Sequence, residues 1–133
     1  MTIYLDASAL VKLVVVEQES DALRQYLGAR RTQIWASSAL VRVEVVRAVR
    51  RVDPNLTPGA VAACRRADII PVSPDLLAEA SKLDPRGLRS LDAIHLASAL
   101  RLANAGLDAF VGYDQRLLQA ASDAGLPTAS PGS

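Results

Sequence analysis

The stretch Ile3-Tyr4-Leu5-Asp6-Ala7-Ser8 places a carboxylate directly after a short apolar run. Three consecutive apolar residues, one aromatic and one β-branched, are typical of a buried strand in an α/β sheet. Asp6 would then lie where this strand ends and a helix begins, which is the edge where open α/β sheets bind ligands. Asp is also a good helix N-cap. By itself, the stretch leaves both a cap and a functional carboxylate open.

Outward from this stretch, short apolar strands alternate with longer amphipathic segments. We expect further strands at 33–36, 69–72 and 109–111, and an edge strand at 126–128. Helices are expected at 9–16, 19–29, 38–51, 57–66, 75–83, 90–104 and 115–124, and a strand remains an alternative for 9–16 and for 41–45. We expect Ser37 or Ser38, and Ser90, to be N-caps. This alternation predicts an α/β fold with a mainly parallel sheet and helices on both faces.

Bulk properties restrict the class of protein. The 133 residues predict one domain over residues 1–128, followed by a disordered tail at 129–133. A net charge of +1 gives the molecule as a whole no strong attraction for nucleic acid. The single cysteine, Cys64, excludes an intrachain disulfide and a paired-thiolate zinc site, and it fits a reducing compartment. With no signal peptide and no membrane-length apolar run, we expect a cytoplasmic protein without membrane contact.

Three carboxylates occupy similar predicted positions, and a fourth is placed unusually. Asp6 and Asp114 each follow a strand, and Asp92 lies in the first turn of a helix. Glu44 lies in the most apolar helix, between two valines. Each position has a simpler interpretation, since Asp92 and Asp114 can cap helices or complement their dipoles. Glu44 can likewise pair with Arg47 one turn along the helix.

The four carboxylates taken together favour a cation site. Burying several carboxylates side by side is unfavourable unless a cation lies among them. An all-oxygen ligand set, without a partnering Cys or His, favours a hard ion such as Mg²⁺ or Mn²⁺.

Four motifs occur in order: Leu5-Asp6-Ala7-Ser8-Ala9-Leu10, Glu44 within a helix, Leu91-Asp92-Ala93-Ile94-His95-Leu96-Ala97, and Tyr113-Asp114-Gln115-Arg116-Leu117. Together they resemble the PIN domain, and most closely the VapC toxins of bacterial type II toxin–antitoxin systems. The resemblance covers the chain from Ile3 to about Pro127.

The resemblance implies a fold, a chemistry and partners. It implies a PIN-like α/β/α sandwich with a mainly parallel, four- to five-stranded sheet. It also implies a Mg²⁺-dependent endoribonuclease toxin, with Mn²⁺ as a substitute, that hydrolyses RNA through metal-activated water. The implied partners are a cognate antitoxin, an RNA substrate and a second copy of the chain. The alternative is a catalytically weak module of the same fold that binds RNA or an antitoxin. The implied metal-binding catalytic residues are Asp6, Glu44, Asp92 and Asp114, with Ser8 in support.

Several neighbouring residues complete the expectations. Many relatives carry Ser or Thr where this chain has Gly112, so a hydroxyl near the last acid is missing. We expect His95 to be a partly buried helix residue near the site rather than a general base. Arg86 and Arg89 can either touch RNA phosphates or belong to a solvated loop, and both remain open. The apolar circumference of helix 38–51 also predicts a subunit contact.

Overall fold

The computed structural model describes residues 1–133 and contains one five-stranded sheet whose neighbouring strands are all parallel. The strands are β1 (Thr2–Leu5), β2 (Ile34–Ser38), β3 (Asp68–Ile70), β4 (Leu107–Val111) and β5 (Thr128–Ala129), in the order β3-β2-β1-β4-β5. The predicted α/β class and parallel sheet are confirmed.

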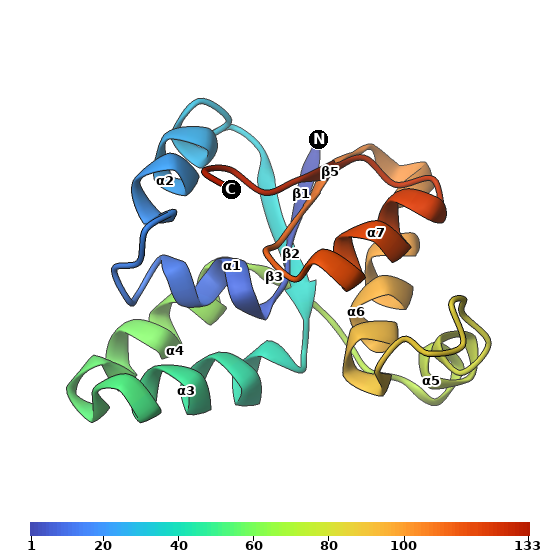
Figure 1. Ribbon diagram of the computed structural model, residues 1–133, viewed down its shortest axis with the longest axis horizontal. Helices are drawn as coiled ribbons and strands as arrows, with labels where there is room; N and C mark the ends of the chain where they lie inside the picture. Colours follow the sequence, from blue (N-terminus) through green and yellow to red (C-terminus); the bar gives the residue numbers. More distant parts are fainter.

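Seven α-helices cover the two faces of this sheet. They are α1 (Ala7–Lys12), α2 (Ser20–Gly28), α3 (Val41–Val52), α4 (Thr57–Arg66), α5 (Pro74–Ala80), α6 (Ser90–Leu100) and α7 (Gln115–Asp123). In Figure 1, α1 to α4 lie on one side of the strands and α5 to α7 on the other. The arrangement is the predicted α/β/α sandwich. None of these helices has the length and apolar character that a membrane crossing requires.

The side chains of β1 alternate between the two layers of helices. Ile3 and Leu5 belong to the apolar cluster with residues of α1 to α4. Tyr4, between them, packs instead with Phe110 of β4 and Leu96 of α6. This is the period-2 alternation of a strand. Because both faces are covered, residues 3–5 of β1 are all buried, and this explains why they form a short continuous apolar run.

The strand order places a topological switch point between β1 and β4. From β1 the sheet grows through β2 to β3 on one side, and β4 and β5 add to the other. At such a point the connections after the two strands leave in opposite directions, which opens a crevice at their carboxyl ends. Asp6 follows β1 directly, and Asp114 follows β4 by three residues, so both lie at this crevice.

The start of α3 differs from the prediction. β2 continues to Ser38, and α3 begins only at Val41. Ser37 Oγ donates to the carbonyl of Leu5 on the neighbouring strand, and Ser38 Oγ accepts from the amide of Leu40. Neither serine therefore caps α3, whose N-cap is Leu40 without a side-chain hydrogen bond. One hydroxyl binds the neighbouring strand and the other binds the turn before α3. The sequence pattern of a helix cap does not predict these contacts.

The expected cap of α6 and the ends of two helices also differ. Ser90 is the first residue of α6, and Arg89 is its N-cap, in extended conformation. α6 ends at Leu100, before a short 3₁₀ turn and a left-handed Gly106 (φ 88°). α1 ends at Lys12, just before the β-branched residues at 14–16 that lower helix propensity.

The last residues pack against the domain, although disorder was expected for 129–133. Ala129 pairs with Val111 as the last residue of β5. Tyr113 Oη donates to the carbonyl of Pro131 over 2.8 Å. Ordered backbone contacts therefore continue beyond residue 128, because β5 gives the chain an edge strand to follow.

Candidate active site

Asp6 is the buried centre of the site and the N-cap of α1. Its side chain is almost fully buried, and Oδ1 accepts from the amide of Ala9 over 3.0 Å. Burial raises the pKa of Asp6, an effect opposed by its hydrogen bond with Ser8 and enhanced by the nearby charge of Glu44. The cap and the functional carboxylate, which the sequence left as alternatives, are thus compatible roles of one residue.

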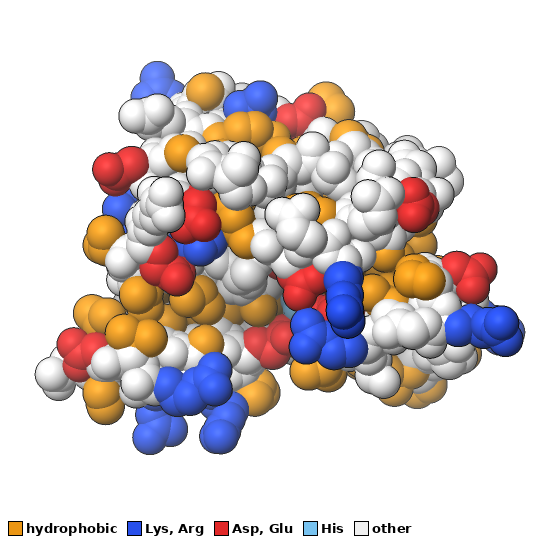
Figure 2. All heavy atoms as spheres, viewed as in Figure 1, with side chains coloured by type: hydrophobic (Ala, Val, Ile, Leu, Met, Phe, Trp, Pro, Cys, Tyr) orange, Lys and Arg blue, Asp and Glu red, His pale blue; other side chains and the backbone are white.

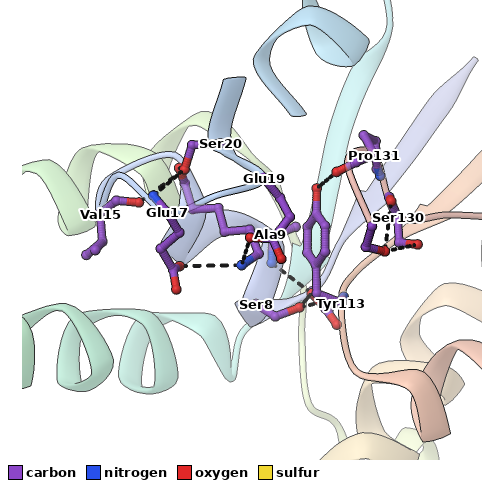
Figure 3. Close-up of polar contacts among 12 residues, drawn as sticks. Ser8, Ala9, Val15, Glu17, Glu19, Ser20, Tyr113, Ser130 and Pro131 are labelled. Atoms are coloured by element: carbon purple, nitrogen blue, oxygen red, sulfur yellow. Dashed lines mark hydrogen bonds and ion pairs between the residues drawn. The ribbon is translucent and has the colours of Figure 1, made fainter. Parts of the chain in front are cut away.

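Ser8 ties Asp6 to the end of β4. Its Oγ donates to Asp6 Oδ1 over 2.6 Å and accepts from the amide of Tyr113 over 2.9 Å. Figure 3 shows Ser8 beside Tyr113, whose ring extends toward Pro131 in the C-terminal segment. The hydroxyl therefore donates to one element and accepts from the other, so Ser8 positions the Asp6 carboxylate.

Gly112 lets the Asp6 carboxylate approach the backbone after β4. A Cβ built at position 112 would lie 2.3 Å from Asp6 Oδ2 and 2.7 Å from its Cγ. No real side chain tolerates such contacts, so the carboxylate occupies the volume that a larger residue would need. Gly112, where the family resemblance implies a residue with a hydroxyl group, is therefore sterically coupled to Asp6. The hydroxyl that contacts Asp6 belongs to Ser8.

Asp92 and Asp114 are brought together by Arg89. The Nε of Arg89 lies 3.4 Å from Asp92 Oδ2, and its Nη2 lies 3.1 Å from Asp114 Oδ2. Asp114 also caps α7, because its Oδ1 accepts from the amide of Leu117. Partial burial raises the pKa of Asp92, and the charge of Asp114 raises it further, while Arg89 lowers it.

Glu44 is held by a histidine rather than by Arg47. Glu44 Oε1 lies 2.7 Å from Nε2 of His95, and Nδ1 of His95 lies 2.7 Å from the hydroxyl of Tyr4. His95 is 2% exposed, more buried than expected, and Tyr4 is fully buried. Glu44 points from α3 toward α6, and a chain of two hydrogen bonds links it to the interior of the sheet.

All four predicted acids lie at this side of the molecule, and their contacts divide them into smaller groups. Arg89 joins Asp92 and Asp114, His95 holds Glu44, and Asp6 is bound by Ser8. Figure 2 shows acidic side chains next to basic ones in the hollow between the α3 side and the α5–α6 side. No three His, Cys, Asp or Glu side chains of the chain converge into a ready-made metal-binding group.

The residues nonetheless suit a hard divalent ion by their donor chemistry. The ligand atoms are carboxylate oxygens, which Mg²⁺ and Mn²⁺ prefer. Asp92 and Asp114 already share one cation, the Arg89 guanidinium, so the pair has a demand for positive charge.

Sequence reasoning identified the acids and missed the partners that hold them. Tyr4 read only as a strand residue, and the Tyr4–His95–Glu44 contacts join residues 51 and 91 positions apart. The pairing of Arg89 with Asp92 has a local signal, because the two are three residues apart at a helix start. Its second contact, with Asp114, has none.

Comparison with known proteins places the chain in a family. The model of the PIN domain family matches residues 3–122. Ribonuclease VapC35 of Mycobacterium tuberculosis is 43% identical over 98% of this chain and 97% of its own length. Ribonuclease VapC47 of the same organism is 44% identical, again over 98% and 97%.

Solved structures show the same fold. The crystal structure of Mycobacterium tuberculosis VapC20, described as a toxin that cleaves the sarcin–ricin loop, superposes with a TM-score of 0.72 at 21% identity. The superposition covers 97% of this chain and 99% of that one. PAE2754 from Pyrobaculum aerophilum superposes with a TM-score of 0.56 at 18% identity, over 96% and 92%. The chain therefore belongs to the PIN domain family, as a full-length relative of the VapC ribonucleases.

Proposed function

We propose that this chain is a Mg²⁺-dependent endoribonuclease that serves as the toxin of a toxin–antitoxin pair. The observation that supports the proposal is that Asp6 and Asp114 follow β1 and β4 at the crevice, and that Arg89 links Asp114 to Asp92. Full-length relatives named as ribonucleases, 43–44% identical, support it. We further propose that the protein acts in the cytoplasm, where RNA and the antitoxin are made.

In this proposal, Asp6, Glu44, Asp92 and Asp114 would hold the divalent ion, and Mn²⁺ can replace Mg²⁺. When bound, the ion supplies activation of a water and neutralises charge on the scissile phosphate. Ser8 fixes the rotamer of Asp6, and His95 fixes the direction of Glu44. No side-chain nucleophile is required, and the Ser8 hydroxyl instead holds Asp6 and the backbone of Tyr113 together.

The proposed partner that silences the toxin is an antitoxin, and an apolar groove suits it. The cavity has a volume of about 630 Å³ and lies between α2, α4 and β2. Trp35 lines it together with Leu27 and Leu56, and three arginines stand around these apolar residues: Arg24, Arg31 and Arg66. This combination favours an amphipathic antitoxin segment that carries acidic side chains beside its apolar face.

The groove can be tested by adding one negative charge to it. Ala62 is an exposed residue of the lining, and Ala62→Glu should weaken capture of the co-expressed antitoxin. Ala78→Glu, at an exposed position of α5 outside the groove, is the matched control. Equal antitoxin binding by both variants, measured by co-purification, would place the antitoxin elsewhere.

A homodimer is proposed from α3. The helix buries Val41, Val45 and Val49 against the core, whereas Val43 is 61% exposed and Val52 is 63% exposed. Exposed valines on a helix that borders the site favour contact with a second copy. Light scattering at micromolar concentration should give twice the monomer mass of 14.1 kDa, and Val43→Asp should reduce it. A wild-type protein that stays monomeric removes this part of the proposal.

The proposed activity is tested by mapping RNA 5′ ends in cells after a short pulse of expression. The wild-type chain should create new 5′ ends and stop growth, and Asp92→Asn at equal expression should do neither. Purified protein should cleave RNA in Mg²⁺, and EDTA should stop it. If Asp92→Asn arrests growth as well as the wild type, cleavage is not the cause and the binding-module alternative holds.

A further inference from the structure

Arg89 lies between two of the four acids and contacts both of them. As the N-cap residue of α6, it turns its side chain back toward Asp92 in the first turn of its own helix. The same guanidinium reaches across to Asp114, the N-cap of α7, at 3.1 Å. In each case the accepting atom is Oδ2. One side chain of the protein therefore supplies positive charge to two carboxylates from different helices.

The contact is suited to exchange rather than to permanent structure. The Arg89 side chain is 70% exposed, whereas those of Asp92 and Asp114 are 18% and 33% exposed. Ion pairs of an exposed arginine contribute little, because water and salt compete for both partners. The two carboxylates keep their positions through helix geometry, since they lie in the first turn of α6 and at the cap of α7. Of the three side chains, the long one of Arg89 is by far the most exposed.

We propose that Arg89 is an exchangeable counter-cation of this site, an inference that rests on the proposed function. It neutralises Asp92 and Asp114 in the metal-free protein, and these carboxylates would release it when they hold a divalent ion. The released guanidinium then contacts the phosphate of the bound RNA. A phosphate matches the planar fork of arginine, and the carboxylates and the phosphate are alternative anions for the same donor groups.

Arg86 differs from Arg89 in a way that makes it a matched control. It lies three residues earlier in the same exposed loop, carries the same charge and forms no ion pair. General attraction of RNA by a basic loop would make the two arginines equivalent. If Arg89 exchanges with a cation at the carboxylates, then only Arg89 should affect the affinity for Mn²⁺.

The test compares Arg89→Gln, Arg89→Lys and Arg86→Gln with the wild type in two measurements. The first is the dissociation constant of Mn²⁺, from calorimetry and from the electron paramagnetic resonance signal of free Mn²⁺. The second is kcat/KM for cleavage of an RNA that the wild type cleaves. Arg89→Gln should bind Mn²⁺ about three- to tenfold more tightly, because a competing cation is gone, and should lose at least about tenfold in kcat/KM. Arg89→Lys should keep near wild-type Mn²⁺ affinity and an intermediate kcat/KM. Arg86→Gln should leave Mn²⁺ affinity unchanged.

The outcomes separate this inference from the proposed function. Mn²⁺ affinity that is unchanged or weaker in Arg89→Gln, with the wild type binding normally, overturns the exchange and makes Arg89 a structural clamp. Tighter Mn²⁺ binding with unchanged kcat/KM overturns the contact with phosphate. A wild type and an Arg89→Gln variant that both bind no Mn²⁺ overturn the metal site of the proposed function, and this inference with it. Circular dichroism melts confirm that each variant is folded.

Discussion

His95 and Glu44 are in direct contact, with Nε2 of the imidazole 2.7 Å from Oε1 of the carboxylate. Burial raises the pKa of Tyr4 well above its usual value, so the phenol keeps its proton, and its hydroxyl is hydrogen-bonded to Nδ1 of His95. Because Nε2 of the same ring faces Glu44, the imidazole is held at both of its nitrogens. The buried end of this chain thus determines the direction of a carboxylate at the surface.

Removal of the imidazole should impair the site and the fold together. We expect His95→Ala to lower kcat/KM about 10- to 100-fold, the usual effect of losing a residue that orients a metal ligand. The free energy of unfolding should fall by about 2–4 kcal/mol, because a buried ring is deleted and the Tyr4 hydroxyl loses its acceptor. RNA cleavage assays and urea unfolding measure the two effects.

Tyr4→Phe separates orientation from packing. It keeps the ring that stacks on Phe110 and deletes only the hydroxyl. We expect a smaller fall in kcat/KM than in His95→Ala. The imidazole ¹⁵N chemical shifts should also change, because Nδ1 of His95 loses its hydrogen bond with the phenol. If both His95→Ala and Tyr4→Phe keep the wild-type kcat/KM, then Glu44 does not need the hydrogen bonds of His95 and Tyr4 for its function.

Three of the predicted site acids follow local patterns in the sequence, whereas Glu44 was included through the family resemblance, and the role of all four stays a prediction. Asp6 and Asp114 come after apolar strands, and Asp92 stands at a helix start, so element order alone brings them to one sheet edge. The alternation of elements likewise predicted the parallel sheet. These inferences needed only periodicity and the rule that parallel strands share an edge.

The partners of the acids could not be predicted in the same way. The sequence predicts a partly buried His95 near the site, and the structure buries it almost completely. Its contact with Glu44 depends on how α3 and α6 are placed relative to each other. Ser90 was assigned as a cap from residue type, and the neighbouring Arg89 has that position. Such details follow from tertiary packing, which overrides local propensity at helix ends.

Gly112 should be intolerant of any side chain. Gly112→Ala brings a methyl group against the Asp6 carboxylate, which Ser8 and Ala9 already hold. We expect a loss of about 1–3 kcal/mol in the free energy of unfolding and a loss of RNA cleavage of at least about tenfold. Gly112→Ser, which restores the hydroxyl common among relatives, should behave in the same way because its Cβ meets the same atoms.

Gly28→Ala is the control for this prediction. A Cβ at position 28 meets nothing within 4 Å, and the residue ends α2. Alanine there should leave stability unchanged or raise it slightly, since glycine is a poor helix former. If Gly112→Ala proves as harmless as Gly28→Ala, then Asp6 relaxes freely and the close approach has no functional importance.

Asp6 should make stability depend on pH in the metal-free protein. Its pKa is raised by burial, so folding favours the protonated form. A raised carboxyl pKa contributes stability that is fully present below the unfolded pKa and is lost as pH rises through the folded pKa. Asp6→Asn cannot ionise, and should therefore raise the melting temperature at pH 7.5 in EDTA by about 3 °C, which is about 1 kcal/mol for a domain of this size.

The difference in melting temperature between Asp6→Asn and the wild type should shrink as the pH falls toward 4, because the wild-type carboxyl regains its proton. Asp92→Asn should show the same trend more weakly, because Asp92 is less buried and Arg89 compensates part of its charge. Asp68→Asn, at an exposed position of β3, is the control and should give no such trend. A melting temperature difference for Asp6→Asn that is constant from pH 4 to 7.5 would mean that the buried carboxyl does not titrate in this range.

Mg²⁺ should stabilise the wild type and much less the variant that lacks one ligand. The ion binds the native acids and hardly the unfolded chain, so a tenfold excess over its dissociation constant adds about 1.4 kcal/mol. For a chain of this length, that raises the melting temperature by about 3–7 °C. Asp92→Asn should start from a slightly higher metal-free value and respond less, because the repulsion by Asp114 and one ligand are both lost. The measurement is a thermal melt of both proteins with and without Mg²⁺ at matched ionic strength. Equal shifts would exclude Asp92 as a ligand, and no shift in the wild type would remove the metal site itself.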